Sequence, residues 1–170
     1  MKISTGPVAL ARPGWGFEDG RTYGFVADCG RPDALIAQVL AGAAVSGART
    51  LMLLPGMREE DPVWACLVQL MSGGDRRAMA QALGSVPLSV HTAGSGKERL
   101  AGAHLVYAPG LQPRELKALR VQSGAPFLIM QEEGADEKII VGGDIIALDG
   151  EGIEIPVAFD QRGPMYLPAR

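Results

Sequence analysis

The stretch that decides the fold reads YGFVADC (residues 23–29), GRPD (30–33), ALIAQVLAGAAVS (34–46) and TLMLL (50–54). Its first and last segments are apolar runs typical of strands that are covered on both faces of a sheet. Between them, Pro32 and Asp33 suit the start of a helix and Gly47 suits its end. The stretch therefore predicts a strand, a helix and a parallel strand, a unit of about the minimal length for a crossover.

The helix expected over Ala34–Ser46 has almost no polar face. Gln38 and Ser46 carry its only polar side chains. A helix that is apolar all round is stable only when other elements cover it. We therefore expect this helix to be packed on most of its sides.

The same alternation continues along the chain. Further helices are expected at Pro62–Met71, Arg76–Leu83, Glu98–Ala103 and Pro113–Gln122, and further strands at Val86–Val90, His104–Ala108 and Phe127–Met130. Strands at Lys138–Val141, Asp144–Leu148 and Ile153–Phe159 then follow one another, and the turn Asp149–Gly152 indicates a hairpin. The pattern predicts a single-domain α/β fold: a mostly parallel, doubly wound sheet of Rossmann or flavodoxin type, with helices on both faces and antiparallel edge strands from the C-terminal β-hairpin.

Composition narrows the functional classes. The 170 residues suffice for one sizeable core, so we expect one domain over 1–170, with 1–21 as an N-terminal strand or arm and 160–170 as a tail. A net charge of −3 argues against nucleic acid or an anionic membrane as the main partner. No apolar stretch reaches the ~18 residues of a membrane span, and no signal peptide is visible, so we expect a cytoplasmic protein. Neither a metal nor a cofactor is predicted, because Cys29 and Cys66 lack the spacing of metal ligands.

The most suggestive loop is HTAGSGK, residues 91–97. The N–H groups of Gly94 and Gly96, a following helix that Ser95 can cap, and the Lys97 ammonium would all favour an anion. The loop is not a Walker phosphate loop, because that motif needs glycine at His91 and a hydroxyl residue at position 98, which is glutamate. It is therefore a candidate anion-binding loop, and an ordinary surface turn is the alternative.

Four loops are expected at the carboxyl edge of the sheet, where ligands of such folds bind: residues 28–33, 55–59, 91–97 and 109–112. In the first of them, Arg31 and Asp28 are candidate ligand-binding residues. Cys29 and His91 are weak candidates for a nucleophile and its base, provided that their strands are adjacent. The alternative is that Cys29 acts as a small hydrophobic residue and that Asp28 and Asp33 form a turn and a helix cap.

Two stretches resemble known families. Asp33–Met57, a helix of small residues and a strand ending in Pro-Gly, is similar to the first half of sulfur-relay proteins of the DsrE type. The cysteine that those proteins use after a later strand has no counterpart here, where His91 stands. The region from Leu100 to Ile145 is similar to periplasmic regulators of the YfiR type. Neither resemblance assigns a function.

Two functional hypotheses follow. The first is a non-catalytic interaction, structural or regulatory protein that self-associates or binds a protein partner; the polar-poor helix and the proline-containing arms at both ends favour it. The second is a binding protein or enzyme for a phosphorylated or other anionic small molecule, which would use the loop 91–97. The sequence contains no complete catalytic motif, so the first hypothesis is preferred over catalysis.

Overall fold

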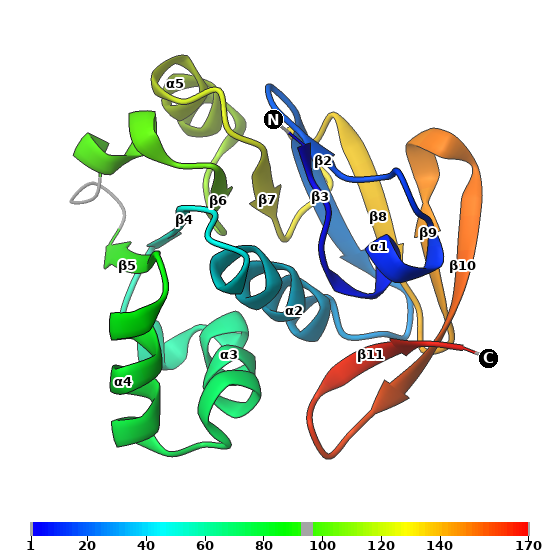
Figure 1. The fold of residues 1–170 in the computed structure, drawn as a ribbon. Helices are drawn as coiled ribbons and strands as arrows, with labels where there is room; N and C mark the ends of the chain where they lie inside the picture. The colour runs from blue at the N-terminus through cyan, green and yellow to red at the C-terminus, as the bar shows by residue number, and fades with distance from the viewer. Residues whose placement is uncertain (1, 93–96, 170) are drawn as a thin grey trace.

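The structure is a computed structural model that describes residues 2–92 and 97–169. Figure 1 shows its helices and strands, with the N-terminus beside β2 and β3 and the C-terminus after β11. In chain order the elements are β1 (Lys2–Ile3), α1 (Gly6–Ala11), β2 (Phe17–Glu18), β3 (Thr22–Ala27), α2 (Pro32–Val45), β4 (Thr50–Leu54), η1 (Arg58–Glu60), α3 (Pro62–Ser72), α4 (Arg76–Ser85), β5 (Leu88–Thr92), η2 (Lys97–Gly102), β6 (Leu105–Tyr107), α5 (Pro113–Gln122), β7 (Phe127–Ile129), β8 (Glu137–Val141), β9 (Ile145–Leu148), η3 (Asp149–Glu151), β10 (Ile153–Asp160) and β11 (Met165–Pro168).

The main sheet has the order β11-β10-β9-β8-β3-β7-β6-β4-β5. The strands from β8 to β5 in this order run parallel, whereas β9, β10 and β11 join by antiparallel pairing. The predicted fold class is confirmed: a mixed α/β domain with a mostly parallel sheet and antiparallel C-terminal strands. The first crossover passes over β7 and β6 before it reaches β4, so the strand order differs from those of the Rossmann and flavodoxin folds.

Side chains that alternate along the parallel strands form a core on each face of the sheet. In β4, Met52 and Leu54 belong to one apolar cluster and Leu51 and Leu53 to the other. The first cluster lies under α2, α3 and α4, and the second under α5 and η2, on the opposite side of the sheet (Figure 1). This double cover explains why the parallel strands are apolar on both faces.

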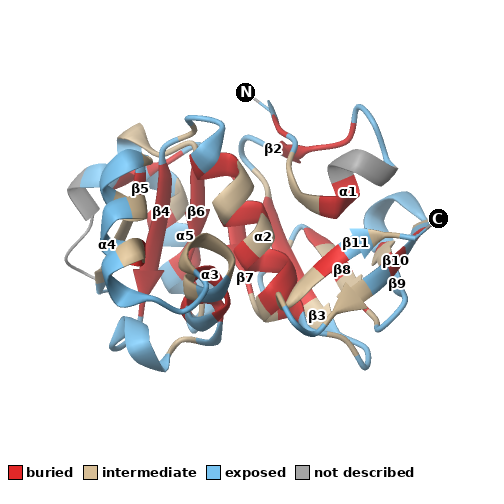
Figure 2. Ribbon diagram, turned by 60° about the horizontal axis from the view of Figure 1, so that its bottom comes forward, coloured by how far each residue is buried: buried red, intermediate tan, exposed pale blue. Residues whose placement is uncertain are grey.

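Helix α2 is buried along most of its length, as its composition predicts. Nine of its residues are buried, and Figure 2 shows it between α3 and the strands of the C-terminal half. The N-terminal segment covers the neighbouring part of this face through β1, α1 and β2. Its residues Trp15 and Phe17 meet Tyr23 of β3 edge to face, with the Phe17 and Tyr23 ring centroids 4.8 Å apart. Such contacts add to the burial of the aromatic surface.

Two elements differ from the prediction around the candidate loop. Strand β5 begins at Leu88 and extends to Thr92, two residues later at each end than expected. Pro87 has no N–H to donate, and its carbonyl accepts the Thr50 N–H where the ladder starts. His91 therefore lies in the strand. The helix expected over 98–103 is the 3-10 helix η2, a form that short segments often take.

The last residues form a strand where a surface tail is expected. In β11, the Tyr166 N–H donates to Gln38 Oε1 at 2.6 Å, and Gln38 Nε2 donates to the Tyr166 carbonyl at 2.9 Å. The one polar side chain in the middle of α2 thus fixes the C-terminal strand. In the described ranges, 2–92 and 97–169, no helix is long and apolar enough to cross a membrane.

Candidate functional site

Cys29 and His91, a candidate nucleophile and base, follow or end strands that are not adjacent in the sheet. The turn 28–31 follows β3, and the loop that contains 93–96 follows β5, with β7, β6 and β4 between them. Four strand spacings correspond to roughly 19 Å. Cys29 is therefore not beside His91, and the condition for a nucleophile and base pair is not met. Likewise, Arg31 and Asp28 follow β3, four strand spacings from Thr92, the last described residue before 93–96.

The candidate anion loop itself lies mostly outside the described residues. This applies to Gly94, Ser95 and Gly96, and Lys97 is described only as the first residue of η2. His91, the first residue of the stretch 91–97, lies in β5. Its Nε2 atom is buried and has no hydrogen-bond partner among the residues that the structure describes.

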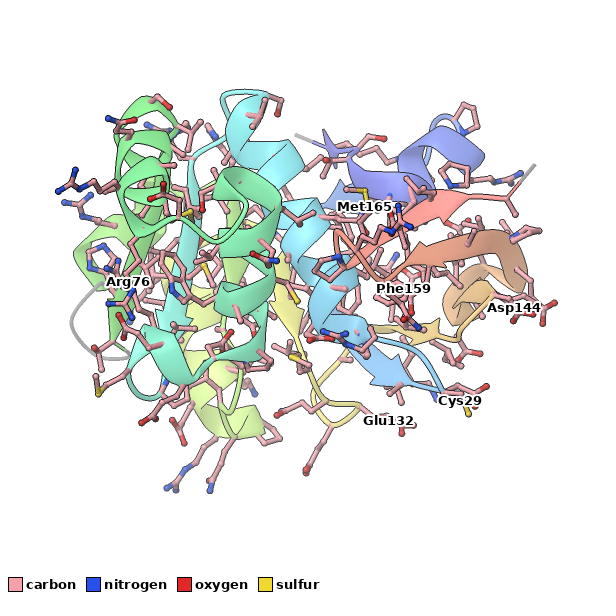
Figure 3. The ribbon with its side chains drawn as sticks, turned by 90° about the horizontal axis from the view of Figure 1, so that it is seen from below. Cys29, Arg76, Glu132, Asp144, Phe159 and Met165 are labelled. Carbon is pink, nitrogen blue, oxygen red and sulfur yellow. The ribbon has the colours of Figure 1, made fainter. Side chains whose placement is uncertain are left out.

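Cys29 is exposed and adopts a positive φ of 63°, a backbone conformation that is uncommon outside glycine. Figure 3 looks onto the face covered by α2, α3 and α4: Cys29 lies near the C-terminal strands, and Arg76 of α4 lies on the opposite side of the molecule. No group of three His, Cys, Asp or Glu side chains suited to a metal ion occurs in the described part of the chain.

The turn between β3 and α2 is closed by the C-terminal strand. The Arg31 N–H donates to Tyr166 Oη at 2.8 Å, and that hydroxyl donates to the Gly142 carbonyl at 2.9 Å. Gly30 packs so tightly against the carbonyls of Val141 and Gly142 that a Cβ atom there would overlap both. The backbone of the turn thus contacts the Tyr166 hydroxyl and the carbonyls of Val141 and Gly142. These contacts would have to break before the turn could surround a ligand.

Charges at the start of α2 are neutralised internally. Arg31 Nε and Nη2 contact the Asp33 carboxylate at 3.0 and 2.7 Å, a two-pronged pair. Burial by itself would raise the pKa of Asp33, but the hydrogen bonds and charge of Arg31 outweigh it and hold that pKa below its ordinary value. As an anion in the first turn, Asp33 also complements the positive end of the helix.

Cys66 of α3 completes this group without making it reactive. Its Sγ lies 3.5 Å from Asp33 Oδ2 and 3.6 Å from Arg31 Nη2. Burial and the neighbouring Asp33 charge raise the pKa of the Cys66 thiol to about 11. The thiol is therefore protonated at neutral pH, and it serves as a packed neighbour of the ion pair.

A second feature lies on the antiparallel half of the sheet, on the face opposite α2. The pairs Val26 with Ile140, Ile145 with Pro156, and Ala158 with Leu167 stand side by side on this face. Ile145 is 37% and Leu167 43% exposed. We call this surface the open sheet face; its apolar members are Val26, Ile140, Ile145, Ala147, Pro156, Ala158 and Leu167.

Sequence reasoning did not identify the open sheet face or the role of Tyr166. A signal for the first was present, because Ile145–Leu148 is apolar on both faces, although an antiparallel strand with one face open to solvent usually alternates apolar and polar residues. No comparable signal marks Tyr166. Its partner Arg31 stands 135 positions away in the chain.

Comparison with known proteins identifies the fold. No family model matches the sequence, and no curated protein sequence matches it. The structure resembles a KaiC-like protein from the hyperthermophilic archaeon Pyrococcus horikoshii, with a TM-score of 0.64 and 11% identity over 100% of this chain and 98% of that one. It also resembles the ATPase domain of a second protein, with a TM-score of 0.66 and 12% identity over 97% of this chain and 90% of that domain. Neither is a family that the two short stretches of sequence resemble.

Proposed function

We propose that this chain is a non-catalytic interaction protein, which associates with a second copy of itself through the open sheet face. The carrying observation is that seven apolar residues adjoin on a sheet face, with Ile145 and Leu167 well exposed. Contiguous exposed apolar surface is a feature of interaction sites rather than of isolated monomers. Its charged neighbours are Lys138 and Glu154 toward one end and Asp160 toward the other. A weakly charged patch can face its own copy across a two-fold axis without strong repulsion.

The β3–α2 turn supports a non-catalytic role. The similar ATPase domain suggests a nucleoside triphosphate as the ligand to consider, and such a ligand needs free N–H groups and a lysine at a turn of this kind. Here the Arg31 N–H is taken by Tyr166, Pro32 has no N–H, and Asp33 places a carboxylate where a phosphate would approach. The residues present therefore do not fit a triphosphate.

Sedimentation velocity tests the proposed association. We expect a concentration-dependent dimer, and we expect Ile145→Asp or Leu167→Asp to weaken it by roughly 30-fold or more, because each places a charge in an apolar interface at a cost of about 2 kcal/mol. Val121→Asp is the matched control, since Val121 is 85% exposed but lies on α5. A wild-type chain that stays monomeric at every soluble concentration, or equal weakening by the control, contradicts the proposal.

A second candidate function is the binding of a phosphorylated or other anionic small molecule by the loop 91–97. Two observations favour it: the fold is shared with a domain named as an ATPase, and the loop follows a parallel strand at the edge where ligands of α/β sheets bind. A thermal-shift screen with nucleotides and phosphorylated metabolites tests it. A ligand that stabilises the wild type and not Lys97→Ala supports this function. Stabilisation that persists in Lys97→Ala refutes the loop as the site.

A further inference from the structure

A pocket of about 430 Å³ opens at the opposite, amino-terminal edge of the sheet. Its floor is formed by the first residues of β4 and β5, where Thr50 stands opposite Leu88, and η2 ends over it at Gly102. Volumes of this size are typical of small-molecule sites. The residues that line it are Arg49, Thr50, Leu51, Val86, Pro87, Leu88, Ser89, Arg99, Gly102 and Ala103.

The pocket is basic on an otherwise acidic chain. Arg49 and Arg99 line it, and none of its described lining residues is acidic. Among the side chains that the structure describes, which leave out positions 9–11 and 93–98, neither arginine forms an ion pair, whereas Arg31 and Arg58 are each paired with a carboxylate. Arginine is the side chain best suited to hold phosphate or carboxylate in a two-pronged contact.

Arg49 is held rigidly at the wall of this pocket. Its backbone N–H donates to His104 Nδ1 at 3.0 Å, and its carbonyl accepts the His104 N–H at 2.7 Å. Its guanidinium carbon would lie 3.9 Å from a Cβ atom at Gly102, which places the cationic group against η2. The backbone that carries this guanidinium is therefore already ordered, so less conformational entropy is lost when the side chain binds a ligand.

The contact between Arg49 and His104 lacks an acceptor. Because Nδ1 accepts the Arg49 N–H, the neutral ring must carry its proton on Nε2. That Nε2 atom lies 3.3 Å from Arg49 Nη2, which is also a donor. The contact therefore gives the Arg49 guanidinium no acceptor, and its N–H groups can donate to an anion in the pocket.

We infer that this pocket binds a small organic anion whose phosphate or carboxylate group is held by Arg49 and Arg99. The oxygens of the ligand accept from both guanidinium groups, which line the pocket. The apolar walls formed by Leu51, Val86 and Pro87 take the body of the ligand, which favours an organic phosphate over the inorganic ion. This inference does not depend on the proposed self-association, which uses another part of the sheet.

Titration of the ¹⁵N-labelled chain with phenyl phosphate, benzoate and inorganic phosphate tests the pocket. We expect saturable shifts of the Thr50, Ser89 and Gly102 amides with phenyl phosphate or benzoate, and binding of inorganic phosphate that is roughly tenfold weaker because it leaves the apolar walls uncovered. Arg49→Ala and Arg99→Ala should each weaken the organic ligand by roughly tenfold or more.

The controls separate this site from general charge attraction and from the loop 91–97. Arg76→Ala removes an exposed arginine on α4 and should leave the affinity unchanged. Arg49→Lys keeps the charge but not the two-pronged geometry, and it should lie between the wild type and Arg49→Ala. The inference is overturned if none of the three anions gives saturable shifts, if Arg76→Ala weakens binding as much as Arg49→Ala, or if Lys97→Ala abolishes a binding that Arg49→Ala leaves intact.

Discussion

Replacement of Tyr166 by phenylalanine removes the side-chain hydroxyl that binds the β3–α2 turn to the C-terminal strands. Tyr166 is 1% exposed, and its hydroxyl makes two short hydrogen bonds, one from the Arg31 N–H and one to the Gly142 carbonyl. The ring of the mutant fills the same space. The variant therefore leaves a backbone donor and a backbone acceptor without their partner in a partly buried turn.

Each group left unsatisfied costs about 1–3 kcal/mol, and water can reach the Arg31 side of this turn. We expect Tyr166→Phe to lower the free energy of unfolding in urea by about 1–3 kcal/mol in total. Tyr107→Phe is the matched control. Tyr107 is also buried, but its hydroxyl reaches Asp61 and Met130 only at 3.4 Å each, beyond the range of strong O–H bonds.

The control should therefore change stability by less than about 0.5 kcal/mol, or raise it, because it removes a poorly bonded buried hydroxyl. Equal effects of the two substitutions would refute the reasoning. They would mean that the hydroxyl of Tyr166 does not hold the turn closed, even though its distances are short.

Three further predictions concern packing and titration. Gly30→Ala should lower the free energy of unfolding by about 2 kcal/mol or more because its methyl group would overlap two backbone carbonyls, whereas Gly124→Ala, which meets nothing, should stay within about 0.5 kcal/mol; urea titration compares them. Burial raises the pKa of the Glu137 carboxyl above its ordinary 4.5, so its stabilising contribution is present below that pH and is lost as the pH rises through the higher folded pKa. As the pH rises above about 4.5 the wild type should thus lose stability relative to Glu137→Gln, and parallel pH profiles would contradict this. At neutral pH iodoacetamide should label the exposed Cys29 and should not label the buried Cys66, whose pKa is about 11, until urea unfolds the chain. Mass spectrometry counts the labels, and rapid labelling of both cysteines in the native chain would contradict this prediction.

The sequence predicts the layers of this fold well because they depend on local signals. Continuous apolar runs and glycine or proline stops locate the parallel strands and most helices, and the lack of polar residues in Ala34–Ser46 predicts the burial of α2. These signals act over a few residues. They therefore hold wherever the segment lies in the sheet.

Strand order and the closure of the turn depend on partners far apart in the chain. The distance between Cys29 and His91 depends on the positions of β4 and β5 relative to β3 in the sheet. No residue near Cys29 or His91 indicates this strand order. Similarly, the segment 165–168 resembles a tail until Gln38 and Arg31 are seen to bind Tyr166. Each such contact joins segments more than a hundred residues apart.

The surface features were hidden for a different reason. An apolar residue such as Ile145 or Leu167 reads as core in a sequence, and only the lack of a covering helix on that half of the described sheet makes it surface. Arg49 and Arg99 read as ordinary surface charges. Only the structure shows that both line one pocket, between the amino-terminal ends of β4 and β5 and the end of η2.

Titration of the ¹⁵N-labelled chain with Mg²⁺ and ATP tests most directly the claim on which the non-catalytic role depends, namely that the β3–α2 turn does not hold a phosphate. We expect no saturable shift in the amides of Arg31, Asp33 and Ala34, and no increase in ATP hydrolysis above buffer. Saturable shifts at these three amides, together with turnover that Arg31→Ala abolishes, would contradict it.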